Sequence, residues 1–130
     1  MPEPANAAGP APRPATLRVL LVEDEATIAV TLGDDLVERG HRVTLLADGV
    51  EALRRLDAAR FDAVISDLRL PGADGITVLE RARRHNPAAR LLLVTAFAEE
   101  RHAAAMRRAG ATLLQKPFAN DTVLAWLDAG

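Results

Sequence analysis

Short runs of apolar, largely β-branched residues recur along the chain, with helix-length segments between them. The runs are RVLLV (18–22), RVTLLA (42–47), DAVIS (62–66), RLLLV (90–94) and ATLLQ (111–115). Each run is continuous rather than alternating, which is typical of strands that are covered on both faces. The pattern therefore predicts five strands of a parallel sheet.

The segments between these runs carry apolar residues at helical spacing. The first places Ile28, Leu32 and Leu36 four residues apart, and further helices are expected at 50–56, 75–85, 99–110 and 120–130. Gly40 and Gly110 are expected to end the first and fourth helices. Five strand–helix units predict an α/β fold in which a parallel, doubly wound sheet has helices on both faces.

Length and composition narrow the class of protein to which the chain can belong. A chain of 130 residues predicts one domain with one core, and the absence of cysteine excludes disulfides, zinc–cysteine sites and thiol catalysis. The net charge of −2 gives no indication of a nucleic-acid or membrane surface. No apolar run approaches the roughly 18 residues that cross a bilayer. His41, His85 and His102 lie in separate segments without paired spacing, so all three are expected at the surface.

The first sixteen residues differ from the rest. They hold five of the eight prolines and almost no large apolar side chain. Such a segment buries too little surface to offset its ordering entropy, so residues 1–16 are expected to be a flexible arm or linker and residues 17–130 the folded domain. The arm lacks the apolar stretch of a secretory signal, which favours a cytoplasmic protein.

Polar side chains follow four of the five predicted strands. Glu23 and Asp24 follow the first, Asp67 the third, Thr95 the fourth and Lys116 the fifth. In a doubly wound sheet, ligands bind beyond the carboxyl ends of the strands, where the strand order reverses. The lysine is the only one among the 16 Lys and Arg residues, which indicates that its position requires a compact point charge rather than a guanidinium.

This set of side chains predicts phosphoryl chemistry. Carboxylates suit Mg²⁺ (or Mn²⁺), and the main-chain carbonyl of Arg69 is a further candidate ligand. A carboxylate between such a metal and a lysine can act as a nucleophile and form an aspartyl phosphate, which makes Asp67 the candidate acceptor. Lys116 and Thr95 are then expected to bind the phosphoryl oxygens.

These motifs resemble the receiver domain of two-component response regulators. The resemblance covers residues 17 to about 129 and rests on the acidic pair, D-x-x-L-P-x-x-D-G from Asp67, V-T-A around Thr95 and K-P-F from Lys116. It implies the flavodoxin-like strand order 2-1-3-4-5, Asp67 as phosphoacceptor, and Mg²⁺ held by Glu23 and Asp24, with Asp24 the stronger ligand. It also implies a phosphohistidine donor on a histidine kinase or phosphotransfer protein, and slow self-dephosphorylation.

One departure concerns the switch that the resemblance implies. In the family, a threonine moves toward the phosphoryl group while an aromatic residue three positions before the lysine turns inward. Here Thr95 is present, but the aromatic position is Leu113. Phosphorylation is expected to survive this departure. The inward turn of an aromatic side chain, which is the second part of the family's switch, is the step that the leucine affects.

Several whole-protein functions remain open. The leading one is a signalling phosphoprotein rather than an enzyme. It is expected to lack an output domain and to act through an unknown downstream protein partner. Neither nucleic acid nor a membrane is expected as a partner. An alternative is the C-terminal receiver of a hybrid histidine kinase. Another alternative is a metal-dependent phosphatase. Such an enzyme typically has an acid two residues after its nucleophile, and the arginine that this chain has there, Arg69, disfavours this alternative. A nucleotide- or flavin-binding module needs a phosphate-cradling loop after the first strand, where VEDEAT is acidic.

The first predicted helix has a second apolar face. At 100° per residue, four small or β-branched residues fall about 140° to 200° around from the core stripe: Ala26, Val30, Gly33 and Val37. A helix that covers one face of a sheet needs an apolar arc of only a little over 100°. These residues are therefore predicted to receive a helix of the histidine-bearing kinase domain.

Overall fold

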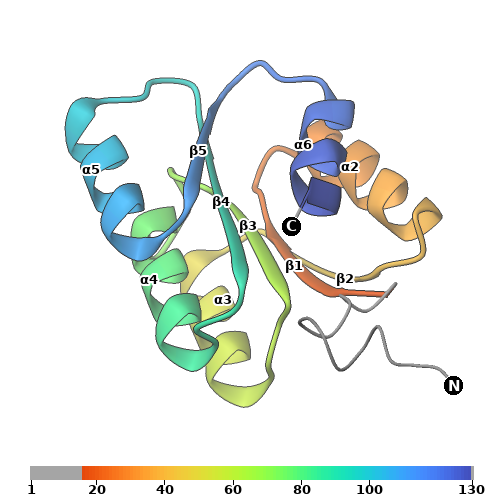
Figure 1. Cartoon of the computed structure of the whole chain (residues 1–130), viewed down its shortest axis with the longest axis horizontal. Coiled ribbons are helices and arrows are strands. Elements are labelled where there is room, and N and C mark those ends of the chain that lie inside the picture. The colour runs from red at the N-terminus through yellow and green to blue at the C-terminus, as the bar shows by residue number, and fades with distance from the viewer. Residues whose placement is uncertain (1–15, 130) are drawn as a thin grey trace, which may run out of the picture.

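The computed structural model describes residues 16–129, so the expected arm, apart from Thr16, lies outside the described residues. Five strands alternate with five helices (Figure 1): β1 (Arg18–Val22), α2 (Ala26–Glu38), β2 (Arg42–Leu46), α3 (Gly49–Ala58), β3 (Ala63–Asp67), α4 (Gly75–His85), β4 (Arg90–Thr95), α5 (Glu100–Ala109), β5 (Thr112–Gln115) and α6 (Asn120–Ala129). Each predicted strand and helix is present, with ends that differ by a few residues at most. None of these helices is long and apolar enough to cross a membrane.

The strands form one parallel sheet in the order β2-β1-β3-β4-β5, which confirms the predicted fold. The chain order reverses between β1 and β3, because β1 pairs with both β2 and β3. Val22 pairs with Ser66, and Thr95 pairs with Gln115. This register brings the residues that follow β1, β3, β4 and β5 to the same edge of the sheet.

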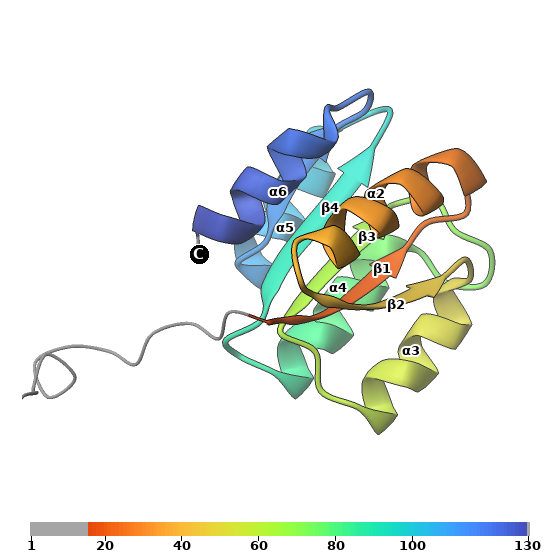
Figure 2. The ribbon, with the colours of Figure 1, turned by 90° about the vertical axis from the view of Figure 1, so that its right-hand side faces the viewer.

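Helices cover both faces of the sheet. The helices α2 and α6 lie against one face, and α3, α4 and α5 lie against the other (Figures 1 and 2). Each layer buries its own apolar cluster. On the α2 and α6 side the helices contribute Leu32, Leu36, Val123, Leu124 and Leu127; on the other side they contribute Ala52, Leu56, Val78, Leu79, Ala82, Ala105 and Met106. The sheet strands are thus buried on both faces, as their continuous apolar runs predict.

The expected helix ends are confirmed at two glycines, and one histidine prediction is wrong. Gly40 and Gly110 both adopt positive φ, at 96° and 68°, just after α2 and α5. His102 is buried, with 6% of its surface exposed, rather than lying at the surface. Its Nδ1 accepts a hydrogen bond from the Glu99 backbone N–H at 3.2 Å, which ties the ring to the start of α5.

The loop between β3 and α4 packs closely against the backbone that carries Asp67. The Gly75 N–H donates to the Leu68 carbonyl at 2.9 Å, and a Cβ at Gly75 would lie 2.1 Å from the Asp67 carbonyl oxygen. A separation below 3.0 Å requires the backbone to move. Gly75 therefore allows α4 to begin directly behind the candidate phosphoacceptor.

We predict that Gly75→Ala destabilises the domain by about 1–3 kcal/mol, because the added methyl overlaps backbone that cannot move freely. Gly33→Ala is the matched control within a helix. A Cβ at Gly33 meets no atom within 4 Å, so this change should stabilise the domain by up to about 1 kcal/mol through helix propensity. Urea denaturation of both variants checks the prediction, and equal effects at the two glycines would contradict it.

Candidate phosphoacceptor site

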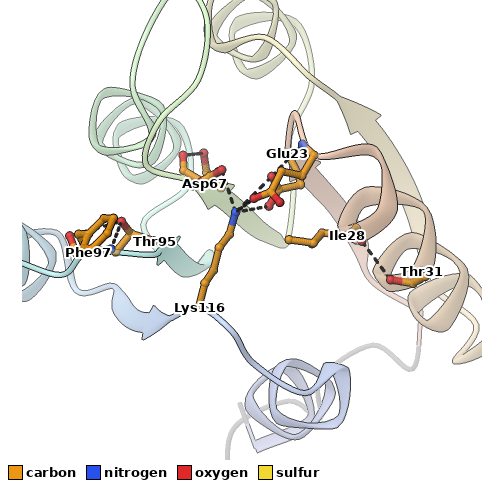
Figure 3. A network of polar contacts seen from close by, with 9 residues as sticks. Glu23, Ile28, Thr31, Asp67, Thr95, Phe97 and Lys116 are labelled. Atoms are coloured by element: carbon orange, nitrogen blue, oxygen red, sulfur yellow. Dashed lines mark hydrogen bonds and ion pairs between the residues drawn. The ribbon is translucent and has the colours of Figure 1, made fainter.

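Three acidic side chains converge on one lysine at the carboxyl edge of the sheet. Asp67 is the last residue of β3, Glu23 follows β1 directly, and Lys116 follows β5 (Figure 3). The Lys116 Nζ lies 3.0 Å from Asp67 Oδ2, 3.2 Å from Glu23 Oε1 and 2.7 Å from Glu25 Oε1. The structure thus brings together Glu23, Asp67 and Lys116 as predicted from the sequence, and adds Glu25.

Burial sets the electrostatics of this cluster. Glu23 and Asp67 are only 2% and 7% exposed. Burial raises the pKa of Glu23 to about 7, although the hydrogen bond from the Glu25 N–H opposes this rise, while the nearby charge of Asp67 adds to it. Burial lowers the pKa of Lys116, but hydrogen bonds to Glu25 and Asp67 outweigh it and raise that pKa above its ordinary value. The lysine is therefore charged at neutral pH, and Glu23 is held close to its protonation midpoint.

The carboxylates suit a hard divalent cation. Oxygens of Glu23, Glu25 and Asp67 lie within 4.8 Å of one another. Asp24 is exposed and is not in this group, but it lines the same surface hollow as Asp67. Glu25 was missed from the sequence, where the only signal was its place in the acidic run, next to the start of α2. The metal roles of Asp24 and of the Arg69 carbonyl stay predictions.

The Thr95 hydroxyl lies beside the hollow but is engaged with its own loop. Its side chain is buried, and its Oγ1 accepts a hydrogen bond from the Phe97 N–H at 3.2 Å (Figure 3). The hollow has a volume of about 380 Å³. Its lining comes from the four segments at the carboxyl ends of β1, β3, β4 and β5: Asp24, Glu25, Asp67, Arg69, Thr95, Ala96, Phe97 and Lys116. Phe97, which sequence reasoning also missed, is 71% exposed at this rim.

Leu113, the other predicted switch residue, lies on β5 next to Leu93 of β4. It is half-buried and packs against the apolar cluster under α3, α4 and α5. An aliphatic side chain has no ring to turn between a buried and an exposed position. Its part in any switch stays a prediction.

The predicted docking face on α2 is only partly exposed. Val30 and Val37 are 54% and 58% exposed, and Ala26 is exposed as well. Gly33 is buried, although no neighbouring atom fills the space above it, and its part in docking stays a prediction. An apolar hollow of about 460 Å³ lies on another side of α2, lined by Thr27, Ile28, Thr31, Pro117 and Phe118 among others.

The fold and this site define the class of protein. Residues 19–128 match the family described as the response regulator receiver domain, so the chain belongs to that family. It is 38% identical over 127 residues to the transcriptional regulatory protein TcrA of Mycobacterium tuberculosis. That alignment covers 97% of this chain and 49% of TcrA, so the chain spans about half the length of this relative.

Solved structures of receiver domains are similar. A CheY-like receiver domain from Methanospirillum hungatei gives a TM-score of 0.81 at 26% identity, covering 86% of this chain and 90% of that one. The receiver domain of a sensor histidine kinase from Pseudomonas aeruginosa gives 0.74 at 31% identity, covering 88% and 97%. That structure has a magnesium ion coordinated in the active site cleft.

We predict that Glu23 makes the metal-free protein less stable as the pH rises from about 5 to 8. The unfolded carboxyl ionises near 4.5, whereas the folded one keeps its proton to about 7. The folded state therefore binds more protons in this window, and the free energy of unfolding falls with rising pH. Glu23→Gln should remove on the order of 1 kcal/mol of this fall.

Urea denaturation in EDTA at both ends of this pH range measures the difference. The two proteins differ only at position 23, so the comparison isolates Glu23. Glu38→Gln, an exposed acid on α2, is the control and should behave like the wild type. A Glu23→Gln protein that loses as much stability with pH as the wild type would refute the assignment.

Proposed function

We propose that this receiver domain accepts a phosphoryl group on Asp67 from the phosphohistidine of a histidine kinase or phosphotransfer protein. An Asp67 carboxylate oxygen forms a bond to phosphorus while the P–N bond of the donor breaks. The electron pair of that bond stays on the imidazole nitrogen, which takes a proton from solvent. The supporting observation is the Asp67 carboxylate, which lines an open hollow with the Lys116 ammonium 3.0 Å away.

The chain's residues also fit a resident Mg²⁺ (or Mn²⁺). We infer that Glu23, Asp24, Asp67 and the Arg69 carbonyl hold it, and that it supplies charge neutralisation for the phosphoryl oxygens. Glu23 must give up its proton to act as a ligand, because a protonated carboxyl competes poorly for a cation. Lys116 binds the same phosphoryl oxygens as a compact cation.

Thr95 and Leu113 carry the proposed response. Thr95 turns from the Phe97 backbone toward the phosphoryl group, which releases the Phe97 N–H and alters the loop that leads into α5. Leu113 follows by repacking of its half-buried side chain rather than by rotation of a ring. A downstream protein partner then binds the altered surface.

The proposed phosphorylated state is reset by water. Attack at phosphorus breaks the bond between phosphorus and the Asp67 oxygen, returning the carboxylate and releasing inorganic phosphate. Arg69 and Phe97 both line the hollow and are exposed, so a water molecule must approach between or past them. Their size and charge are therefore expected to set the lifetime of the phosphoryl group.

Two settings fit this role. The first is a regulator without an output domain, and the second is the C-terminal receiver of a hybrid histidine kinase. The similarity to the receiver of the Pseudomonas sensor kinase supports the second. TcrA, by contrast, is about twice as long as this match, so that relative has chain beyond the matched region.

Intact mass after incubation with Mg²⁺ and acetyl phosphate tests the proposal. The wild type should gain one phosphate. Asp67→Asn should gain none, because the amide is a poor nucleophile, and its fold should persist because one crowded charge is removed. Phosphorylation of Asp67→Asn at the wild-type rate would show that another residue is the acceptor. Steady turnover of a generic phosphate ester would instead indicate a phosphatase.

The α2 face is the proposed kinase-docking surface. Val30 and Val37 are large, apolar and more than half exposed, and a small residue lies between them. The face continues from the acidic run that follows β1, so a helix bound there extends toward the hollow over Asp67. The apolar hollow around Ile28 and Phe118 widens the surface toward α6.

We predict that Val30→Glu slows phosphoryl transfer from a cognate histidine kinase at least tenfold, because a charge would be buried in an apolar contact. Phosphorylation by acetyl phosphate should be unchanged. Val50→Glu, at an exposed valine of α3, is the matched control and should leave both rates unchanged. Loss of both activities in Val30→Glu would place this residue in the core and disprove docking there.

A further inference from the structure

The shortest contact of the single lysine is with an acid that has no proposed role in phosphoryl transfer. The Lys116 Nζ lies 2.7 Å from Glu25 Oε1, closer than the 3.0 Å to Asp67 Oδ2 and the 3.2 Å to Glu23 Oε1. The Lys116 side chain is only 11% exposed, whereas the Glu25 side chain is 60% exposed. Glu25 is therefore a surface acid that forms an ion pair with a largely buried lysine.

Nothing in the described helix requires this acid. Glu25 is the N-cap residue of α2, yet its side chain makes no capping hydrogen bond to that helix. Its backbone N–H instead donates to Glu23 Oε2 at 3.1 Å, which fixes the start of the side chain beside the cluster. Within residues 16–129, its carboxylate pairs with the Lys116 ammonium. The structural cost of changing Glu25 is thus small.

Lys116 cannot satisfy every acceptor once Asp67 is phosphorylated. The new phosphoryl oxygens need the ammonium beside Asp67, while Glu25 draws it toward α2. We propose, on the basis of the function proposed above, that Glu25 is a positioning residue that holds Lys116 in the unphosphorylated protein and releases it to the phosphoryl group. The Glu25–Lys116 contact then belongs to one state only, and it biases the protein toward that state.

The pair also lies between two surface hollows. Glu25 and Lys116 both line the hollow over Asp67, and both line the apolar hollow of Ile28 and Phe118. A side chain placed in the apolar hollow therefore meets this pair before it meets Asp67. Release of Lys116 removes part of the wall between the two.

Removal of the Glu25 charge should favour the phosphoryl-bound state. A partly exposed ion pair contributes little, so Glu25→Gln should bind fluoroberyllate, a phosphoryl mimic, about two- to fivefold more tightly at saturating Mg²⁺. A nearby negative charge would also repel the anion without touching the lysine. A readout on the lysine itself is therefore needed to separate the two causes.

The single lysine makes this readout direct. Protein labelled with ¹³C and ¹⁵N only in lysine gives one set of side-chain signals, which belongs to Lys116. Glu25→Gln should shift these signals in the free protein and leave them at their wild-type positions after addition of Mg²⁺ and fluoroberyllate. Glu99→Gln is the matched control, because this acid is 54% exposed and pairs with Arg101 rather than with Lys116. It should shift the signals in neither state.

Each other outcome is informative. Equal signals for Glu25→Gln and wild type in the free protein would overturn the proposal, since the contact would then not form. Different signals in both states would overturn it too, because Glu25 would then act without release. A wild-type protein that neither responds to fluoroberyllate nor gains phosphate would instead refute the proposed function. Urea denaturation confirms that Glu25→Gln remains folded.

Discussion

The site depends on the crowding of several carboxylates around one ammonium. Glu23 and Asp67 are buried next to each other, and without an opposing charge their repulsion would act against the fold. Lys116 offsets part of that repulsion and is held there by three acids. The negative charge that remains makes the hollow suited to a divalent cation. The crowding that opposes folding is thus also the feature that suits the site to a cation.

Two well-packed layers make this crowding tolerable. The apolar clusters on the two faces of the sheet do not share helices, and both continue under the strands that carry the site. The crowded charges are confined to the carboxyl edge of the sheet, at the last residue of β3 and just after β1 and β5. Native proteins often place locally unfavourable groups at functional sites and compensate for them elsewhere. Here the compensation is the continuous burial of β1, β3 and β4.

The fold could be predicted from the sequence because apolar runs and apolar residues at helical spacing indicate directly which side chains are buried. The residues Glu23, Asp67, Thr95 and Lys116 followed because a parallel sheet collects strand ends at one edge. Glu25, Phe97 and His102 did not follow, because their roles depend on where a loop ends and which way a side chain turns. The burial of Gly33 did not follow either, because a helical wheel gives the direction of a residue but not its exposed area. The sequence pattern thus predicted which residues lie at the ends of strands better than it predicted the contacts that loop residues make.

The separation of the site residues along the chain has a consequence for folding. The lysine and Glu23 are 93 positions apart, and Lys116 follows an edge strand that pairs only with β4. Closing so long a loop is entropically costly, so contacts of this kind form late when a sheet assembles. On this reasoning we expect Glu23 and Asp67 to come together before Lys116 joins them. The whole sheet must therefore be complete before the acidic cluster gains its lysine.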